Sequence, residues 1–286
     1  MIAVLARQYD GNRFSTITPH DHGGQIWITV FLSLVYSSLT FFTRCYIKWH
    51  IFGLDDWAMV GAELLTVGQF AAVMYAVANG LGKSFGIVSD SAQTVLAHAM
   101  FGNAILIILA LAATKASVIL LIRRVFTRDL RRFRLLCNGL LALSIIWGVA
   151  SSIAVSARCD LRPIDPNLPH AAFCADKTTR WKVVVAIDVA TEIVFACLPV
   201  YLVWNLQMKS DLKFRVVLAF MFRLPVAAFS LLFLNAISRS MTNGLLPGVN
   251  VTPWVIWHQV ELGYSLISAT IPCLKSFIKS FDTGLG

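Results

Sequence analysis

The most informative stretch of this chain begins with Gly53-Leu54-Asp55-Asp56-Trp57 and ends with Asn79-Gly80-Leu81-Gly82. Between these ends, Trp57 to Ala78 is a run of 22 residues that carries a single charge, Glu63. At about 1.5 Å per residue, a helix of this length spans the roughly 30 Å hydrocarbon core of a bilayer. The two aspartates suit a helix N-terminus, and the glycines suit a C-terminal stop. The stretch therefore predicts a membrane-spanning helix.

The composition of the whole chain also indicates a membrane protein. Of its 286 residues, 57% are hydrophobic and 14% are charged, and the mean hydropathy is +0.72. Soluble domains carry about 25% charged residues. A net charge of +9 would suit a nucleic-acid partner. The basic residues lie in short loops between apolar runs, however, as membrane orientation requires, so we expect no nucleic-acid partner.

Six further apolar runs resemble the first, so we predict an all-α membrane protein, a seven-transmembrane helix bundle. The predicted helices span residues 25–45, 57–78, 95–122, 135–157, 183–204, 214–236 and 253–273. They form a transmembrane domain of residues 24–274, between a polar N-terminal segment (1–23) and a short tail (275–286). The apolar run Ile2–Ala6 is too short for a signal-peptide core, so the first helix is expected to act as an uncleaved targeting signal.

Lys and Arg counts predict the orientation of the bundle. The loops on the same side of the membrane as the C-terminus carry more Lys and Arg residues than the loops on the opposite side. This difference places the N-terminus outside and the C-terminus in the cytosol. Asn250 begins a glycosylation sequon in a loop that this topology places outside, although Pro253 follows the sequon. Cys159 and Cys174 bracket another outer loop, where oxidising conditions would allow a disulfide.

Ionisable residues within the predicted spans are costly in a bilayer, at about 2.5 kcal/mol or more each, and need partners. They are Glu63, Lys115, Asp188, Glu192, Arg223 and Glu261. Glu63 and Lys115 lie at similar depths near the cytosolic side, so we predict that they form a buried ion pair. Glu192 and Arg223 lie near mid-depth, which makes them a second candidate pair.

The remaining polar residues predict a cluster in the outer half of the bundle. Its candidate members are Asp188, Glu192, Glu261 and His258, with His98 and Arg223 as further ones. On the last helix, Ser265 and Ser268 continue a polar stripe that should face the bundle interior. Two interpretations stay open, a structural network that fixes helix register and a site for a small ligand or a proton. In the sixth helix, Pro225 beside Arg223 predicts a kink.

Four pieces of the chain resemble the fungal rhodopsin-domain family of seven-helix membrane proteins. They are Gly53–Trp57 with Gly80–Gly82; Cys159–Ile164 with Cys174–Asp176; Asp188, Thr191 and Glu192 with Leu198–Val200 and Trp204–Gln207; and Glu261, Tyr264–Ile267, Ala269–Leu274 and Thr283-Gly284. The family includes receptor-like proteins and members encoded in metabolite gene clusters. The chain lacks a cysteine between Asn79 and Val95, a cysteine-rich extracellular domain and a long tail, and these departures weaken a signalling role.

The family name implies retinal, but a retinal Schiff base needs a lysine inside the last helix, and none occurs between Pro253 and Leu274. We therefore expect no retinal, no other cofactor and no metal. The two histidines His20 and His22 have no further ligands near them in the sequence.

Three functions remain open. A receptor-like protein with a polar pocket in the outer half would use an unknown small-molecule ligand, the kink at Pro225 and an unknown cytosolic partner. A membrane-embedded biosynthetic enzyme, of isomerase or cyclase type, would use Asp188 and Glu192 for acid–base chemistry. A transporter is the third, although the odd number of spans argues against it. The sequence predicts a multi-pass membrane protein without distinguishing the plasma membrane from an endomembrane.

Overall fold

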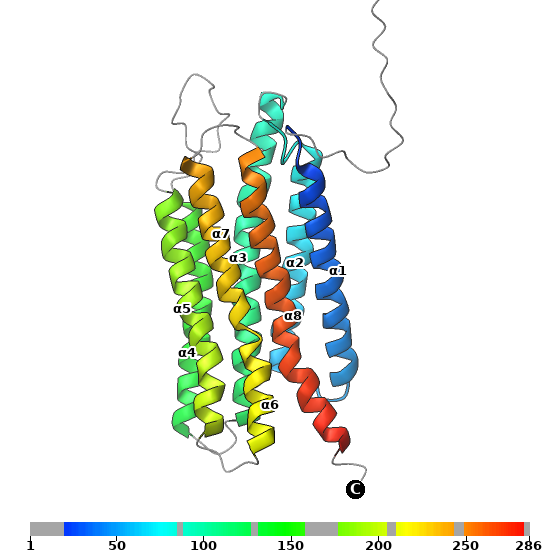
Figure 1. Cartoon of the computed structure of the whole chain (residues 1–286), viewed down its shortest axis with the longest axis vertical. Helices are drawn as coiled ribbons and strands as arrows, with labels where there is room; N and C mark the ends of the chain where they lie inside the picture. The colour runs from blue at the N-terminus through cyan, green and yellow to red at the C-terminus, as the bar shows by residue number, and fades with distance from the viewer. Residues whose placement is uncertain are drawn as a thin grey trace, which may run out of the picture.

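The apolar runs form long helices that lie side by side between the two ends of a bundle (Figure 1). The structure is a computed structural model and describes residues 20–84, 88–126, 131–157, 177–204, 210–242 and 249–282. Its helices are α1 (Gly23–Lys48), α2 (Leu54–Ala78), α3 (Asp90–Phe126), α4 (Arg131–Ser156), α5 (Lys177–Trp204), α6 (Ser210–Met221), α7 (Leu224–Thr242) and α8 (Thr252–Asp282), with a 3-10 turn, η2 (Val249–Val251), before α8. We call the end at which α1 begins the upper end, and the end at which α8 finishes the lower end, as they lie in Figure 1.

Six of the helical segments in the described ranges are long and apolar enough to cross a membrane. They are α1 to α5 and the combined segment of α6 and α7. Helix α8 is not among the six because one of its faces is polar. That face includes His258, Glu261, Ser265 and Ser268, all buried inside the bundle. A helix packed among other helices can carry such a face without exposing it to lipid.

The sixth and seventh predicted helices differ most clearly from those in the structure, whereas α1 to α5 begin two to six residues before their predicted starts. The sixth is broken, because α6 ends at Met221 and α7 begins at Leu224. The seventh does not end at residue 273, because α8 continues to Asp282 through most of the segment predicted as a tail. The described chain thus comprises seven long segments, one of them in two parts.

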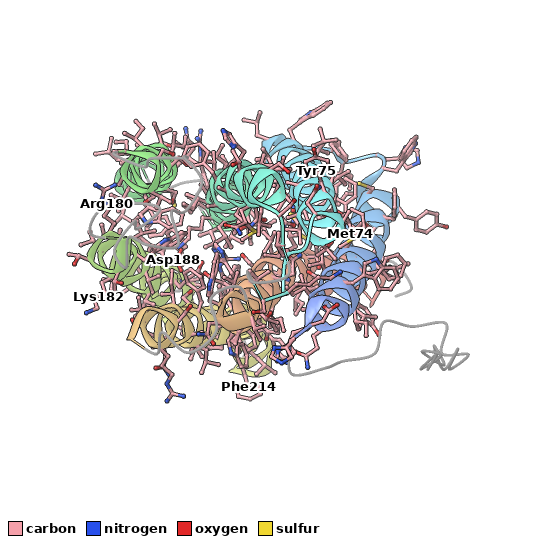
Figure 2. The ribbon with its side chains drawn as sticks, turned by 90° about the horizontal axis from the view of Figure 1, so that it is seen from above. Met74, Tyr75, Arg180, Lys182, Asp188 and Phe214 are labelled. Carbon is pink, nitrogen blue, oxygen red and sulfur yellow. The ribbon has the colours of Figure 1, made fainter. Side chains whose placement is uncertain are left out.

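The helices pack in a ring with α3 towards the inside. Helix α3 packs against α2, α4 and α8, whereas α8 also packs against α1 and α7 (Figure 2). Glycines bring two of these pairs close together. A Cβ on Gly148 would lie 2.6 Å from the Cβ of Ala112, and a Cβ on Gly263 would lie 2.3 Å from Ser33 Oγ. Small residues at such contacts let helices pack closely in membranes.

A glycine turn after α2 connects the end of this helix to the start of α1. Gly80 and Gly82 have φ angles of +104° and +87°, which side chains other than glycine rarely adopt. The Leu81 N–H donates to the carbonyl of Ala76 at 2.9 Å, and the Gly82 carbonyl accepts the His22 N–H at 2.9 Å. The turn therefore ends α2 and also holds the start of α1.

Much of the outside of the bundle is apolar, and several charged residues are buried inside it. Large side chains such as Tyr46, Leu64 and Leu135 are exposed, whereas Arg44 and Lys115 are fully buried. This distribution reverses that of a soluble protein and suits a bundle surrounded by lipid.

Candidate functional site

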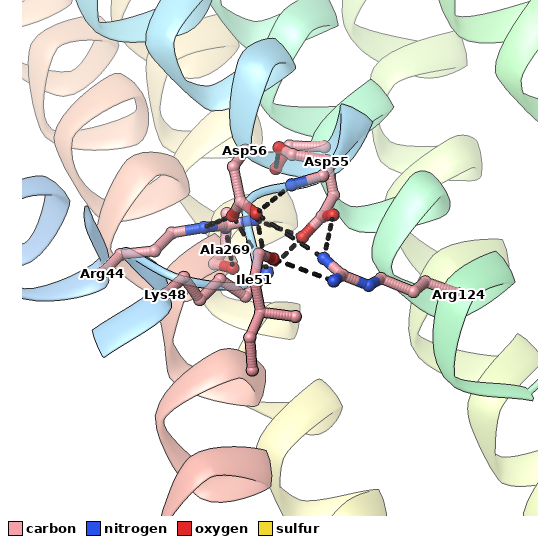
Figure 3. Close-up of polar contacts among 9 residues, drawn as sticks. Arg44, Lys48, Ile51, Asp55, Asp56, Arg124 and Ala269 are labelled. Carbon is pink, nitrogen blue, oxygen red and sulfur yellow. Dashed lines mark hydrogen bonds and ion pairs between the residues drawn. The ribbon is translucent and has the colours of Figure 1, made fainter. Parts of the chain in front are cut away.

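Five charged side chains form a cluster at the lower end, where α1 ends and α2 begins (Figure 3). This lower-end cluster consists of Arg44, Lys48, Asp55, Asp56 and Arg124. Arg44 donates from Nε to Asp56 Oδ1 at 2.8 Å and from Nη2 to Asp55 Oδ2 at 2.9 Å. Lys48 forms ion pairs with both aspartates, and Arg124 Nη1 donates to Asp55 Oδ1 at 3.1 Å. Three cations thus surround two buried carboxylates.

The lower-end cluster joins four helices. Arg44 on α1 also donates from Nη1 to the carbonyl of Ala269 on α8 at 3.2 Å. Ser117 on α3 donates to the backbone carbonyl of Asp55 on α2 at 2.7 Å. Over the part of the chain that the structure describes, no buried charged atom of this cluster lacks a hydrogen-bond partner. These contacts make the cluster a clamp between α1, α2, α3 and α8.

A second set of five charged side chains lies inside the bundle. This central cluster consists of Lys115 on α3, Asp188 and Glu192 on α5, Arg223 between α6 and α7, and Glu261 on α8. Each is at most 3% exposed. Seen from above, Asp188 lies within the bundle while Lys182 points away from it (Figure 2).

Lys115 is the centre of this cluster. Its Nζ lies 3.1 Å from Asp188 Oδ1 and 3.1 Å from Glu192 Oε1. It also donates to Thr191 Oγ1 at 2.6 Å and to the carbonyl of Asp188 at 3.2 Å. The ammonium group lies 5.0 Å from the ring centroid of Trp147, within cation–π range. Lys115 on α3 is therefore in contact with both α4 and α5.

Arg223 links the break in the sixth segment to two other helices. Its Nη2 donates to Glu192 Oε1 at 2.9 Å and to Ser265 Oγ on α8 at 3.4 Å. Its Nη1 is buried and has no hydrogen-bond partner among the described residues. Glu261 Oε2 is in the same situation. Buried polar atoms are nearly always satisfied, so these two atoms are places where a further polar group would be stabilised.

The break itself is held by hydrogen bonds around Phe222 and Arg223. Pro225 has no N–H, and the Val226 N–H donates to the carbonyl of Arg223 at 3.0 Å, so the Phe222 carbonyl is freed from the helical pattern. The Tyr264 hydroxyl on α8 donates to this carbonyl at 3.0 Å. Pro225 lies in the first turn of α7, where its missing N–H costs little.

Ser230 on α7 connects two carboxyl groups of the central cluster. Its Oγ lies 2.9 Å from Asp188 Oδ2 and 2.8 Å from Glu261 Oε1. It also lies 3.1 Å from the carbonyl of Val226. The central cluster therefore includes a hydrogen-bonded chain from Glu261 through Ser230 to Asp188, which in turn contacts Lys115.

The predicted ion pairs have different outcomes. Glu192 and Arg223 do pair, but the predicted pair of Glu63 and Lys115 is wrong. Glu63 instead accepts a hydrogen bond from Ser38 at 2.7 Å. The prediction was based on the depth of each residue along its helix, but the direction of the side chain about the helix axis decides the contact. Ser117 faces α2, and Lys115 lies two residues before it, or about 200° around α3, so its side chain points away from α2.

Of the two histidines predicted for the cluster, one lies away from it and the other lies above it. His98 is exposed, and its Nδ1 contacts the carbonyl of Thr94 on the same helix, so it does not belong to the cluster. His258 is buried between aromatic rings, with centroid distances of 4.2 Å to Phe233 and 5.5 Å to Trp181. It lies one turn above Glu261 on α8 and, together with Phe233 and Trp181, forms an aromatic layer over the cluster.

The sequence did not indicate several contributors. Ser230 and Thr191 are small and uncharged, and only the spacing of Ser230 seven residues after Arg223 could have placed it on the same face. An amide network inside the bundle was not predicted either. In it, Gln69 Nε2 donates to Asn103 Oδ1 and Gln259 Oε1, both at 2.8 Å. Within the described ranges, no three His, Cys, Asp or Glu side chains are arranged to hold a metal ion.

The remaining predictions concern loops that the sequence predicts to lie outside. Cys159 and Cys174 lie outside the described residues. Asn250 lies in η2, directly before α8, and is partly buried.

Comparison with protein families shows that the family model of the fungal rhodopsin domain matches residues 39–280. This range contains both charged clusters. Comparison with curated proteins and with solved structures gives no match.

Proposed function

The chain belongs to the fungal rhodopsin-domain family and is a multi-pass membrane protein, and from this premise we propose that it acts as a receptor-like switch. In this proposal, a small molecule changes the contacts of the central cluster. The change is transmitted through Arg223 to α6, which moves at the lower end of the bundle.

The single observation that carries this proposal is the position of Arg223. It lies in the break between α6 and α7, and its side chain is bound to Glu192 on α5 and Ser265 on α8. A break in a helix lets the two halves change their relative direction, and a buried ion pair at the break can favour one direction over another. A ligand moves such an equilibrium only through different contacts with the two states.

The unpartnered atoms of the cluster indicate the chemistry of the ligand. Arg223 Nη1 offers a donor and Glu261 Oε2 an acceptor, both buried and both without a hydrogen-bond partner among the described residues. Trp181, Phe233 and His258 lie on the upper side with their rings in contact. This combination favours a largely apolar molecule with one polar group, in a polar site in the outer half of the bundle.

The proposal includes a seven-span topology with the N-terminus outside. Helix α8 is the seventh span, and its polar face is turned inwards. The upper end then faces outwards, which makes Asn250 available for glycosylation and allows a disulfide between Cys159 and Cys174. Digestion with a glycosidase, with Asn250→Gln as the control, tests this orientation. A shift in gel mobility on digestion that occurs for the wild type and not for Asn250→Gln supports this orientation.

The alternative, a membrane enzyme that uses Asp188 and Glu192 as an acid–base pair, has less support. Both carboxylates are bound to Lys115, and Glu192 is also bound to Arg223. Glu192, which contacts two buried cations, is thereby a poor proton donor.

A thermal-shift screen of the purified protein in nanodiscs tests the receptor-like function. We expect at least one amphipathic small molecule to raise the melting temperature of the wild type. The Arg223→Met and Glu261→Gln variants should lose this response, whereas Glu63→Gln, a buried carboxyl outside the cluster, should retain it. If no compound stabilises the protein, or if all variants respond alike, the proposal is wrong.

A further inference from the structure

The hydroxyl of Ser230 has too few hydrogens for its neighbours. Asp188 Oδ2, Glu261 Oε1 and the carbonyl of Val226 all lie within 3.1 Å of Ser230 Oγ. A serine hydroxyl donates one hydrogen, and an ionised carboxylate is only an acceptor. If both carboxyl groups were ionised, two of these three contacts would have no hydrogen in them, and at least one of the two would join Ser230 to a carboxylate. A proton on one of the carboxyl groups supplies the hydrogen that this contact lacks.

The charges of the central cluster also indicate one bound proton. Lys115 and Arg223 carry two positive charges, whereas Asp188, Glu192 and Glu261 can carry three negative ones. Lys115 contacts Asp188 and Glu192, and Arg223 contacts Glu192. No ion pair to Glu261 is present in the described part of the chain, and its Oε2 is buried without a partner. An unpaired carboxylate in such a place is far less stable than the neutral acid.

A bound cation such as Na⁺ could also neutralise the extra charge. The distances argue against it, because 2.8 Å and 2.9 Å are ordinary lengths for hydrogen bonds between oxygens. Oxygens that share a hydrogen in this way leave no space for an ion between them.

We propose that Glu261, Ser230 and Asp188 form a proton-binding site that holds one exchangeable proton in the bundle interior. In its resting form, Glu261 Oε1–H donates to Ser230 Oγ, and the Ser230 hydroxyl donates to Asp188 Oδ2. Transfer of the Glu261 proton to Ser230, together with transfer of the Ser230 proton to Asp188, leaves Glu261 negative and Asp188 neutral. Charge is conserved, and Lys115 is then paired with Glu192 alone.

The surroundings of the site favour retention of this proton. The titratable and charged groups that face it are Lys115 from α3, Asp188 and Glu192 from α5, Arg223 from the α6–α7 break, and His258 from α8. Transfer to Asp188 would weaken the contact between Lys115 and α5 and would place a new negative charge on α8. The site thus couples one proton to the contacts among α3, α5, α7 and α8, whether or not the chain is a receptor.

Infrared spectroscopy of the protein in nanodiscs tests the site, because a protonated carboxylic acid has a carbonyl band that ionised carboxylates lack. We expect the wild type to show this band and the band to shift in D₂O. Glu261→Gln should lower the intensity of this band by the contribution of one carboxylic acid. Ser230→Ala should change its frequency, because the acid loses its hydrogen-bond partner.

Glu63 provides the matched control, since it is another buried carboxyl and is bonded by Ser37 and Ser38 rather than by Ser230. Any band that Glu63 contributes should be lost in Glu63→Gln and should not respond to Ser230→Ala. The proposal is overturned if the band keeps its full intensity in both Glu261→Gln and Asp188→Asn. It is also overturned if Ser230→Ala leaves the spectrum unchanged, or if the wild type lacks the band and is stabilised by NaCl but not by choline chloride.

Discussion

The two charged clusters use similar residues in different ways. The lower-end cluster has three cations for two carboxylates, and the described structure satisfies every buried charged atom in it. The central cluster has two cations for three carboxylates, retains unpartnered atoms on Arg223 and Glu261, and lies at a break in a helix. The first arrangement favours one fixed geometry, whereas the second leaves contacts that a proton or a ligand can change.

The position of each cluster explains the difference. At the lower end, Arg124 is 37% exposed, so the excess positive charge can interact with water or with lipid head groups. Inside the bundle, an excess negative charge has no contact with water or lipid head groups, so a proton must neutralise it. Location thus decides whether a buried ionic cluster serves as a clamp or as a responsive site.

The largest effect is expected at the lower-end cluster. Asp55→Asn should lower the free energy of unfolding by about 4 kcal/mol, because Arg44, Lys48 and Arg124 would then share one carboxylate. Thermal unfolding in detergent measures the change. Asp21→Asn is the control, since its pair with Lys83 is 3.8 Å long and partly exposed. Asp21→Asn should lower the free energy of unfolding by less than about 0.5 kcal/mol. Equal losses for the two variants would contradict the clamp.

A smaller effect is expected in the central cluster. Glu192→Gln should cost about 2–3 kcal/mol, because Arg223 loses its carboxylate while Lys115 retains Asp188. Adding Arg223→Met to this variant should restore part of the stability, since it removes the unpaired buried charge. A double-mutant cycle measures the coupling. If the second substitution gives no recovery, the ion pair does not contribute to stability.

The hydrogen bond at the helix break should have a modest effect. Tyr264→Phe leaves the Phe222 carbonyl without its donor and should cost about 1 kcal/mol. Amide hydrogen exchange should increase around residues 222–226 and stay unchanged at the start of α2. Exchange that rises equally at both places would show general destabilisation rather than a local role.

Glu63→Gln should have the smallest effect, below about 1 kcal/mol, because an amide oxygen can still accept hydrogen bonds from Ser37 and Ser38. A loss of about 3 kcal/mol or more would be expected if Glu63 were paired with Lys115. Thermal unfolding under the same conditions as for Asp55→Asn separates the two outcomes.

Much of the fold was predictable from the sequence, since apolar runs and charged ends locate helices in a membrane protein. Helix α3 nevertheless runs past its predicted end at residue 122 to Phe126, and Arg124 in this extension reaches back to Asp55 and to the Ile51 carbonyl. Pro225 predicted the disruption of the sixth helix, but not that Tyr264 would satisfy the carbonyl freed there.

The candidate site was less predictable, because depth along a helix does not give rotation about its axis. Depth suggested Glu63 as the partner of Lys115, whereas the contact of Ser117 with α2 turns Lys115 towards α5. Ser230 had no sequence signal of its own, since a lone serine in a membrane helix is common. The rotation of each helix depends on packing across the whole bundle.

The distinction between clamp and responsive site is tested most directly by spin-label distances at the lower end. Labels would be placed at the exposed positions Phe214 on α6, Leu135 on α4 and Tyr46 on α1, in a background without accessible native cysteines. In the Glu192→Gln, Arg223→Met variant, we predict that the distance distribution between α6 and α4 broadens or shifts, while that between α1 and α4 stays as in the wild type. Unchanged distributions for both pairs, or equal broadening of both, would contradict the account.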